Sequence, residues 1–267
     1  MAATATFLTT AITKLELSNE CAQLGTATGF FIRSNEQWYL VTNWHVFSGR
    51  KPDTGQPRHP SGAVPSFCDY YATALLNDKL VWKKYTLELG SEADDSIAWY
   101  EHPVHGQLVD VAVIRIENVC EPARDILDSG GHDPMMFIDL GADLFLPGFP
   151  LGLSANGLMP IWKRASLASS LEFGHSMTTF FFVDTATREG MSGSPCFAIS
   201  NWRHYSLTGE GAKMKIIDNP MSWRFLGVYS GRFNPSDNFE AQIGKVWREN
   251  LVFEIISSKK KGSFTLK

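Results

Sequence analysis

Two serines lie close together in REGMSGSPCF, a stretch of mostly small residues that runs from Arg188 to Phe197. A serine hydroxyl attacks a carbonyl carbon efficiently only when a neighbouring base takes its proton. The base must itself be held in one tautomer, and a buried carboxylate is a common way to do this. The search for chemistry in this chain is therefore a search for a histidine and an acid that serve Ser192 or Ser194.

The strongest candidate for the base is His45. It lies at the end of the apolar run YLVTNWHVF, which we predict to be a strand that is rigid enough to fix an imidazole. Most other histidines lie in polar, loop-like or turn-like segments, namely His59, His102, His105, His132 and His204. Considered alone, His45 would more often be an ordinary core or surface histidine than a base.

Asp110 is the candidate acid, because it opens the apolar run DVAVIRI. A carboxylate at such a position needs partners, and a histidine ring would be a suitable one. The alternative is a strand-start aspartate that pairs with a loop amide. The chain order His45, Asp110, Ser192 is one of the known triad orders. The rival motif G-x-S-x-G does not fit, since Ser194 occupies its last position.

The elements that must position these residues are predicted to be mostly strands. Runs rich in Phe, Tyr, Val, Ile and Thr alternate with Gly and Pro, as in ATGFFI, YLVTNWHVF, DVAVIRI, DLFLPGF, TTFFFVDT and FLGVYS. Several runs are continuously apolar, as expected of strands covered on both faces. Only residues 248–258 show helical spacing, and we predict a helix there. Two polar segments, 50–65 and 201–223, are expected to be surface loops or hairpins.

Composition indicates a globular protein with a substantial core. Of the 267 residues, 44% are hydrophobic and 19% are charged, and the net charge is −4, which argues against a broad surface for nucleic acid or anionic lipid. The four cysteines, Cys21, Cys68, Cys120 and Cys196, are widely spread, so we expect reduced thiols and no zinc site. The chain shows neither a secretory signal nor a membrane-spanning run, and we therefore expect a cytoplasmic protein.

Taken together, these motifs resemble the trypsin-like serine peptidases of the chymotrypsin fold, in particular the bacterial forms without structural disulfides. TGFFI and YLVTNWHV resemble the strand pair that leads to the catalytic histidine, and DVAVI resembles the segment with the acid. GMSGSP resembles the family's G-[DN]-S-G-[GS]-P. FLGVYSGR resembles the strand beside the substrate cleft, and PGFPLGL resembles a strand and turn of the second barrel. The resemblance covers about residues 20–247.

The resemblance implies an all-β fold of two antiparallel β-barrels with a C-terminal helix. Residues 1–125 would form the N-terminal barrel with His45 and Asp110. Residues 134–267 would form the C-terminal barrel with Ser192 and the helix. A polar, turn-rich stretch from Cys120 to Asp133 would join the two barrels into one peptidase domain.

The resemblance also implies a role for each site residue. His45 would be the general base, Asp110 the orienting acid and Ser192 the nucleophile, and the backbone N–H groups of Gly190 and Ser192 would form the oxyanion hole. Residues near the substrate would be Ala186, Ser230, Gly231 and Arg232.

Three positions depart from the family pattern, and the role of a fourth residue, Arg232, stays open. Asn43 replaces the usual Ala of T-A-x-H. Met191 replaces the usual Asp or Asn and cannot pair with a newly cleaved N-terminus, so we expect no need for activation by cleavage. Ala186 replaces the Asp of a trypsin-like pocket, so charge does not favour Lys or Arg in the substrate. Arg232 would either favour acidic residues or be a solvated charge at the rim.

The leading hypothesis is a serine endopeptidase that acts on protein or peptide substrates, with no metal or cofactor and with neither nucleic acid nor membrane as a partner. An alternative is a catalytically silent protease-fold module that binds a protein or peptide. A third is a general β-sandwich binding domain in which the three motifs occur together by chance. The reactivity of Ser192 separates the first two hypotheses, and the sequence does not predict the oligomeric state.

Overall fold

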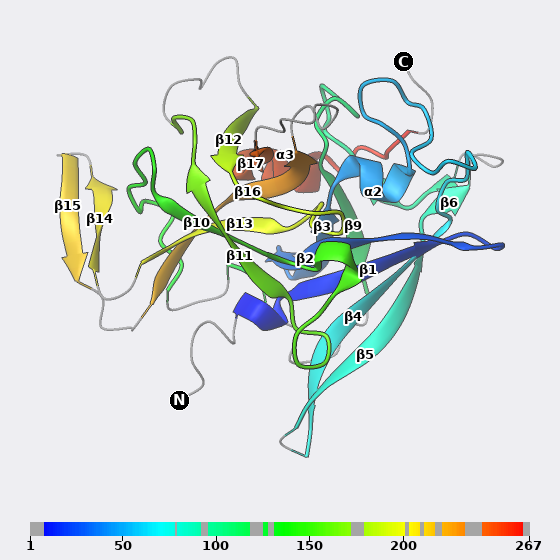
Figure 1. Ribbon diagram of the computed structural model, residues 1–267, viewed down its shortest axis with the longest axis horizontal. Coiled ribbons are helices and arrows are strands. Elements are labelled where there is room, and N and C mark those ends of the chain that lie inside the picture. The colour runs from blue at the N-terminus through cyan, green and yellow to red at the C-terminus, as the bar shows by residue number, and fades with distance from the viewer. Residues whose placement is uncertain are drawn as a thin grey trace.

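Strands make up most of the regular structure in the computed structural model (Figure 1). The residues that the structure describes are 8–77, 79–91, 96–117, 125–127, 131–171, 179–200, 203–208, 211–216, 221–232 and 242–263. No helix within these residues is long and apolar enough to cross a lipid bilayer.

The first half of the chain forms a seven-stranded antiparallel sheet in the order β5-β4-β1-β2-β3-β9-β8. Its strands are β1 (Ile12–Ser18), β2 (Gln23–Ser34), β3 (Gln37–Thr42), β4 (Phe67–Leu76), β5 (Lys79–Glu88), β8 (Trp99–Tyr100) and β9 (Ala112–Ile116). A two-stranded sheet of β6 (Gly90–Ser91) and β7 (Ser96–Ile97) accompanies it. Neighbouring residues of β2 pack into different hydrophobic clusters, Phe30 into one and Phe31 into another. Burial of both faces explains why this run is continuously apolar.

The second half forms a closed antiparallel barrel in the order β10-β11-β12-β17-β16-β13. Its strands are β10 (Asp143–Gly148), β11 (Ile161–Leu167), β12 (Phe180–Asp184), β13 (Pro195–Ser200), β16 (Ser222–Arg232) and β17 (Ile243–Arg248). The short helix η1 (Pro150–Gly152) follows β10. The hairpin of β14 (Arg203–Thr208) and β15 (Gly211–Ile216) lies at the left edge of Figure 1, away from the first sheet.

Helix α3 (Glu249–Ser258) follows the last barrel strand and contacts both halves, through β9 of the sheet and β16 of the barrel. Its buried side chains, Leu251, Val252, Ile255 and Ile256, share one cluster with residues of β2 and β3. The helix therefore helps to fix the junction between the sheet and the barrel.

The all-β class, the closed barrel and the C-terminal helix confirm the sequence predictions. Of the two polar segments, 201–223 contributes the β14–β15 hairpin, although residues 201–202, 209–210 and 217–220 lie outside the described residues. Cys21, Cys68 and Cys196 are free thiols, while Cys120 and most of the predicted connecting stretch also lie outside them. The domain limits 1–125 and 134–267 stay a prediction.

One local prediction was wrong. The run YLVTNWHVF is not strand throughout, because β3 ends at Thr42 and the chain turns into the short helix α2 (Trp44–Ser48). All five residues of α2 are buried, and Gly49 ends the helix with a left-handed φ of 66°. Tertiary burial therefore outweighs the strand propensity of Trp, Val and Phe.

Candidate active site

His45 lies at the start of α2, and its imidazole faces Asp110. His45 Nδ1 is 2.7 Å from Asp110 Oδ2, and the backbone N–H of His45 donates to Asp110 Oδ1 at 2.9 Å. Asp110 lies just before β9, the strand that pairs with β3, so adjacent strands bring the two residues together. One carboxylate thus holds both the ring and the backbone of His45. Because an ionised carboxylate only accepts, Nδ1 carries the ring proton and Nε2 keeps its lone pair.

Burial has opposite effects on the two partners. Removal from water lowers the pKa of His45 below its ordinary value; the charge of Asp110 opposes this shift, and that of Arg58 adds to it. Burial alone would raise the pKa of Asp110, but the charge and hydrogen bonds of His45 outweigh it and keep that pKa below its usual value. Near neutral pH the pair therefore consists of a neutral imidazole and a carboxylate, which is the state that a general base requires.

Asn43 holds the backbone of the acid. Its side-chain Nδ2 donates to the carbonyl oxygen of Asp110 at 2.7 Å, and both residues are buried. One trace of this role is visible in the sequence, namely a side-chain amide where the family that the chain resembles commonly has Ala. That trace did not identify a partner, because the contact joins residues that are far apart in the chain.

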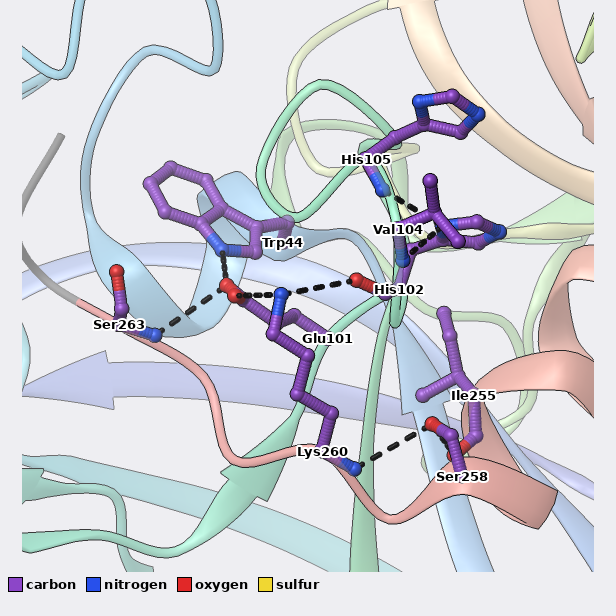
Figure 2. A network of polar contacts seen from close by, with 9 residues as sticks. All are labelled: Trp44, Glu101, His102, Val104, His105, Ile255, Ser258, Lys260 and Ser263. Carbon is purple, nitrogen blue, oxygen red and sulfur yellow. Dashed lines mark hydrogen bonds and ion pairs between the residues drawn. The ribbon is translucent and has the colours of Figure 1, made fainter. Parts of the chain in front are cut away.

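Trp44, next to His45, connects α2 to the segment that follows α3 (Figure 2). Its indole N–H donates to Glu101 Oε2 at 3.2 Å, and the backbone N–H of Ser263 donates to the same oxygen at 3.2 Å. Lys260 Nζ lies 3.2 Å from Glu101 Oε1. Figure 2 shows the carboxylate between these groups, and Glu101 is only 4% exposed. A buried carboxylate with three donors thus joins the histidine-bearing helix to residues 260–263.

The neighbouring His102 has a structural role. Its Nδ1 accepts from the backbone N–H groups of Val104 and His105 at 3.3 and 3.1 Å, and its Nε2 lies 2.9 Å from Glu254 Oε2. Nδ1 is therefore an acceptor, and Nε2 donates its proton to Glu254. These bonds form the turn predicted for EHPVHGQ and attach it to α3.

The two serines of the loop differ in exposure. Ser192 is partly exposed, and a methyl group built on Gly231 would lie 4.0 Å from its hydroxyl oxygen. Ser194 is fully buried, and its hydroxyl has no partner among the described residues. Only Ser192 is accessible to a substrate. Within the part of the chain that is described, the Ser192 hydroxyl makes no hydrogen bond to His45, whose ring contacts Asp110. In enzymes of this kind the bond between serine and histidine often forms fully only when substrate binds.

The backbone amides around Ser192 fall into two groups. Three of them donate to carbonyl oxygens: Met191 to Arg188, Gly193 to Tyr229 and Ser194 to Met191. The amides of Gly190 and Ser192 have no acceptor among the residues that the structure describes. Two free N–H groups in one loop, next to the accessible Ser192, are the kind of donors that bind an oxyanion.

Gly190 and Gly193 allow this loop geometry. Their φ angles are +89° and +86°, which side-chain-bearing residues rarely adopt. A Cβ on Gly190 would lie 2.2 Å from the carbonyl oxygen of Phe149, and one on Gly193 would lie 2.0 Å from that of Thr28. Neither position therefore tolerates a larger residue without rearrangement.

Met191 points away from solvent into the barrel. It is fully buried in the cluster that includes Leu144, Leu146, Cys196 and Val246. The loop is therefore anchored by apolar packing at the position where the related family has Asp or Asn.

The residues predicted near the substrate lie at the end of β16 and before the loop. Ser230, Gly231 and Arg232 are half-buried, and Ala186 is exposed. The Lys163 ammonium group donates to the carbonyl oxygen of Ala186. A cation therefore lies beside this position.

Comparison with known proteins identifies the family. The trypsin-like peptidase domain family matches residues 27–205. No curated protein is similar enough in sequence to count as a relative. Among similar solved structures, the serine endoprotease from Yersinia pestis is 14% identical over 95% of this chain and 64% of that chain, with a TM-score of 0.51. The Rv3671c protease from M. tuberculosis is 16% identical over 97% of this chain and 85% of that chain, with a TM-score of 0.49. Protease Anisep from Arthrobacter nicotinovorans is 15% identical over 93% of this chain and 93% of that chain, with a TM-score of 0.49. Since the family match spans most of the chain, the protein belongs to the trypsin-like peptidases and is a hydrolase of the serine peptidase class.

Proposed function

We propose that the protein is a serine endopeptidase that hydrolyses peptide bonds through an acyl-enzyme, with His45, Asp110 and Ser192 as its catalytic triad. The observation that carries the proposal is the buried Asp110 carboxylate, which holds both the ring and the backbone of His45. The free amides of Gly190 and Ser192 support it, because they lie on either side of Met191 in the loop that carries the accessible serine.

The reaction follows from these positions. His45 Nε2 takes the proton of the Ser192 hydroxyl while its oxygen attacks the scissile carbonyl, and the amides of Gly190 and Ser192 stabilise the resulting oxyanion. The imidazolium, stabilised by Asp110, gives the proton to the leaving amine, and the C–N bond breaks. A water molecule then attacks the ester with His45 as base, which releases the acid and restores the serine.

A serine-directed fluorophosphonate probe tests the proposal. The wild-type protein should become covalently labelled, and Ser192→Ala should abolish labelling because the nucleophile is lost. Ser194→Ala is the matched control, since it removes a hydroxyl two residues away that is buried, and it should keep labelling. A folded wild-type protein that stays unlabelled would instead support the silent binding module.

We also expect that Lys and Arg are not preferred at the residue before the cleaved bond. Ala186 supplies no carboxylate, and the Lys163 ammonium group already contacts its carbonyl oxygen, so a cationic side chain would meet a like charge. A peptide library read by mass spectrometry measures the preference, and Ala186→Asp should shift it towards Lys and Arg. A strong wild-type preference for Lys or Arg would contradict this expectation, and a preference for acidic residues would assign Arg232 a binding role.

A further inference from the structure

We propose that Thr28 is a positioning residue of the oxyanion hole, through which the first sheet sets the geometry of a loop in the second half. The inference rests on the proposed function of Ser192 and its neighbouring amides. Thr28 lies in β2, and its side chain is fully buried. Its sequence context, ATGFFI, is that of an ordinary strand residue.

Thr28 binds both residues whose amides are free. Its hydroxyl donates to the carbonyl oxygen of Gly190 at 2.8 Å, and its backbone N–H donates to that of Ser192 at 2.9 Å. The hydroxyl also accepts from the backbone N–H of Phe149 at 3.1 Å. A threonine hydroxyl has one proton to donate, so the bond to Gly190 uses its whole donor capacity.

Glycine needs such external contacts because its own backbone preferences are weak. The peptide plane before Gly190 is held by Leu151, whose N–H donates to the carbonyl oxygen of Glu189 at 2.6 Å. In a trans peptide the N–H points opposite to the C=O, so this bond turns the amide of Gly190 away from Leu151. The peptide plane after Gly190 is held by the hydroxyl of Thr28. Both planes are thus fixed, the second one by a residue from the other half of the molecule.

Thr28 is itself held in place. Its carbonyl oxygen accepts from the hydroxyl of Thr42 at 2.8 Å, and Thr42 lies at the end of β3, just before the helix that carries His45. Thr28 is therefore attached on one side to the strand that leads to the base and on the other to the loop that carries the nucleophile. Loss of the Thr28 hydroxyl should therefore displace the amides of Gly190 and Ser192 and leave the His45–Asp110 pair unchanged.

Thr28→Val and Thr28→Ser separate the hydroxyl from the shape of the side chain. Valine has nearly the same shape but cannot bond Gly190 or Phe149, and we expect the rate constant of fluorophosphonate labelling to fall about 10- to 100-fold, somewhat less than for loss of an oxyanion donor. Serine keeps the hydroxyl and should stay within about threefold of wild type. The pH midpoint of labelling, which reports His45, should not move in either variant.

The remaining outcomes are also decisive. Thr73→Val is the control, because it also removes a buried threonine hydroxyl, here one in β4 that donates to the carbonyl oxygen of Thr10. This variant should be labelled at the wild-type rate. If the valine variant does not fold by circular dichroism, Thr28→Ala replaces it, and the comparison with serine still isolates the hydroxyl. Wild-type labelling rates in the valine or alanine variant, or equal losses with serine, would overturn the role of Thr28. An unlabelled wild-type protein would overturn the proposed function instead.

Discussion

Asp110→Asn should lower the rate of peptide hydrolysis by about 10⁴-fold while the fold stays intact. The reason lies in the two bonds that the carboxylate makes. Oδ1 accepts from the backbone N–H of His45, so the amide oxygen of asparagine will take that place. The NH₂ group then faces Nδ1, which must accept, and the ring proton moves to Nε2. An Nε2 that carries a proton cannot take one from Ser192.

Nitrogen NMR of the His45 ring and the rate of fluorophosphonate labelling measure the two halves of this prediction. Asp133→Asn is a matched control, since Asp133 is also a buried aspartate that accepts from a backbone N–H and a hydroxyl, at Met135 and Ser206. It should label at the wild-type rate. Normal labelling of Asp110→Asn with the proton still on Nδ1 would show that the carboxylate does not set the tautomer.

Met191→Asp should lower the free energy of unfolding by roughly 3–5 kcal/mol, the cost typical of a buried charge without a partner. The Met191 side chain is fully buried among apolar residues of the barrel, and its sulfur would lie 3.0 Å from a Cβ placed on Gly148. Because the same residue separates the two free amides, we expect the aspartate variant to lose labelling as well. Met191→Leu keeps the apolar volume and should cost less than about 1.5 kcal/mol.

Urea denaturation gives the stability of both variants, and labelling gives their function. Equal stability of the aspartate and leucine variants would mean that Met191 does not anchor the loop.

Apolar anchoring of the loop by Met191 also predicts that the 267-residue chain is labelled without any N-terminal cleavage. Labelling that appears only after N-terminal trimming would contradict the view that Met191 replaces an activation ion pair.

The three residues of the proposed triad could be selected from the sequence because each lies in a short motif. His45, Asp110 and Ser192 stand beside apolar runs or in a glycine-rich loop, and these patterns are local. The choice of Ser192 over Ser194 agrees with the exposure of the two hydroxyls in the structure.

The residues that support the site left almost no local signal. Thr28 looks like any strand threonine, and its contact with Gly190 spans 162 residues. Glu101 contacts Trp44 across 57 residues and Ser263 across 162. Helix α2 was missed for a related reason, since its residues favour strands and only tertiary packing makes them helical. Such contacts depend on the assembled fold and cannot be read from spacing along one segment.

The Glu101 carboxylate also has a consequence for the order of events during synthesis. Ser263 follows it by 162 residues, which at a typical rate of 5–20 residues per second is roughly 8–32 s of translation. During that interval Trp44 and Glu101 have been made, but the donors from residues 260–263 do not yet exist. Ser192 is also made before those donors. The helix that carries His45 therefore gains these contacts only after residues 260–263 have been made, which is later than the synthesis of Ser192.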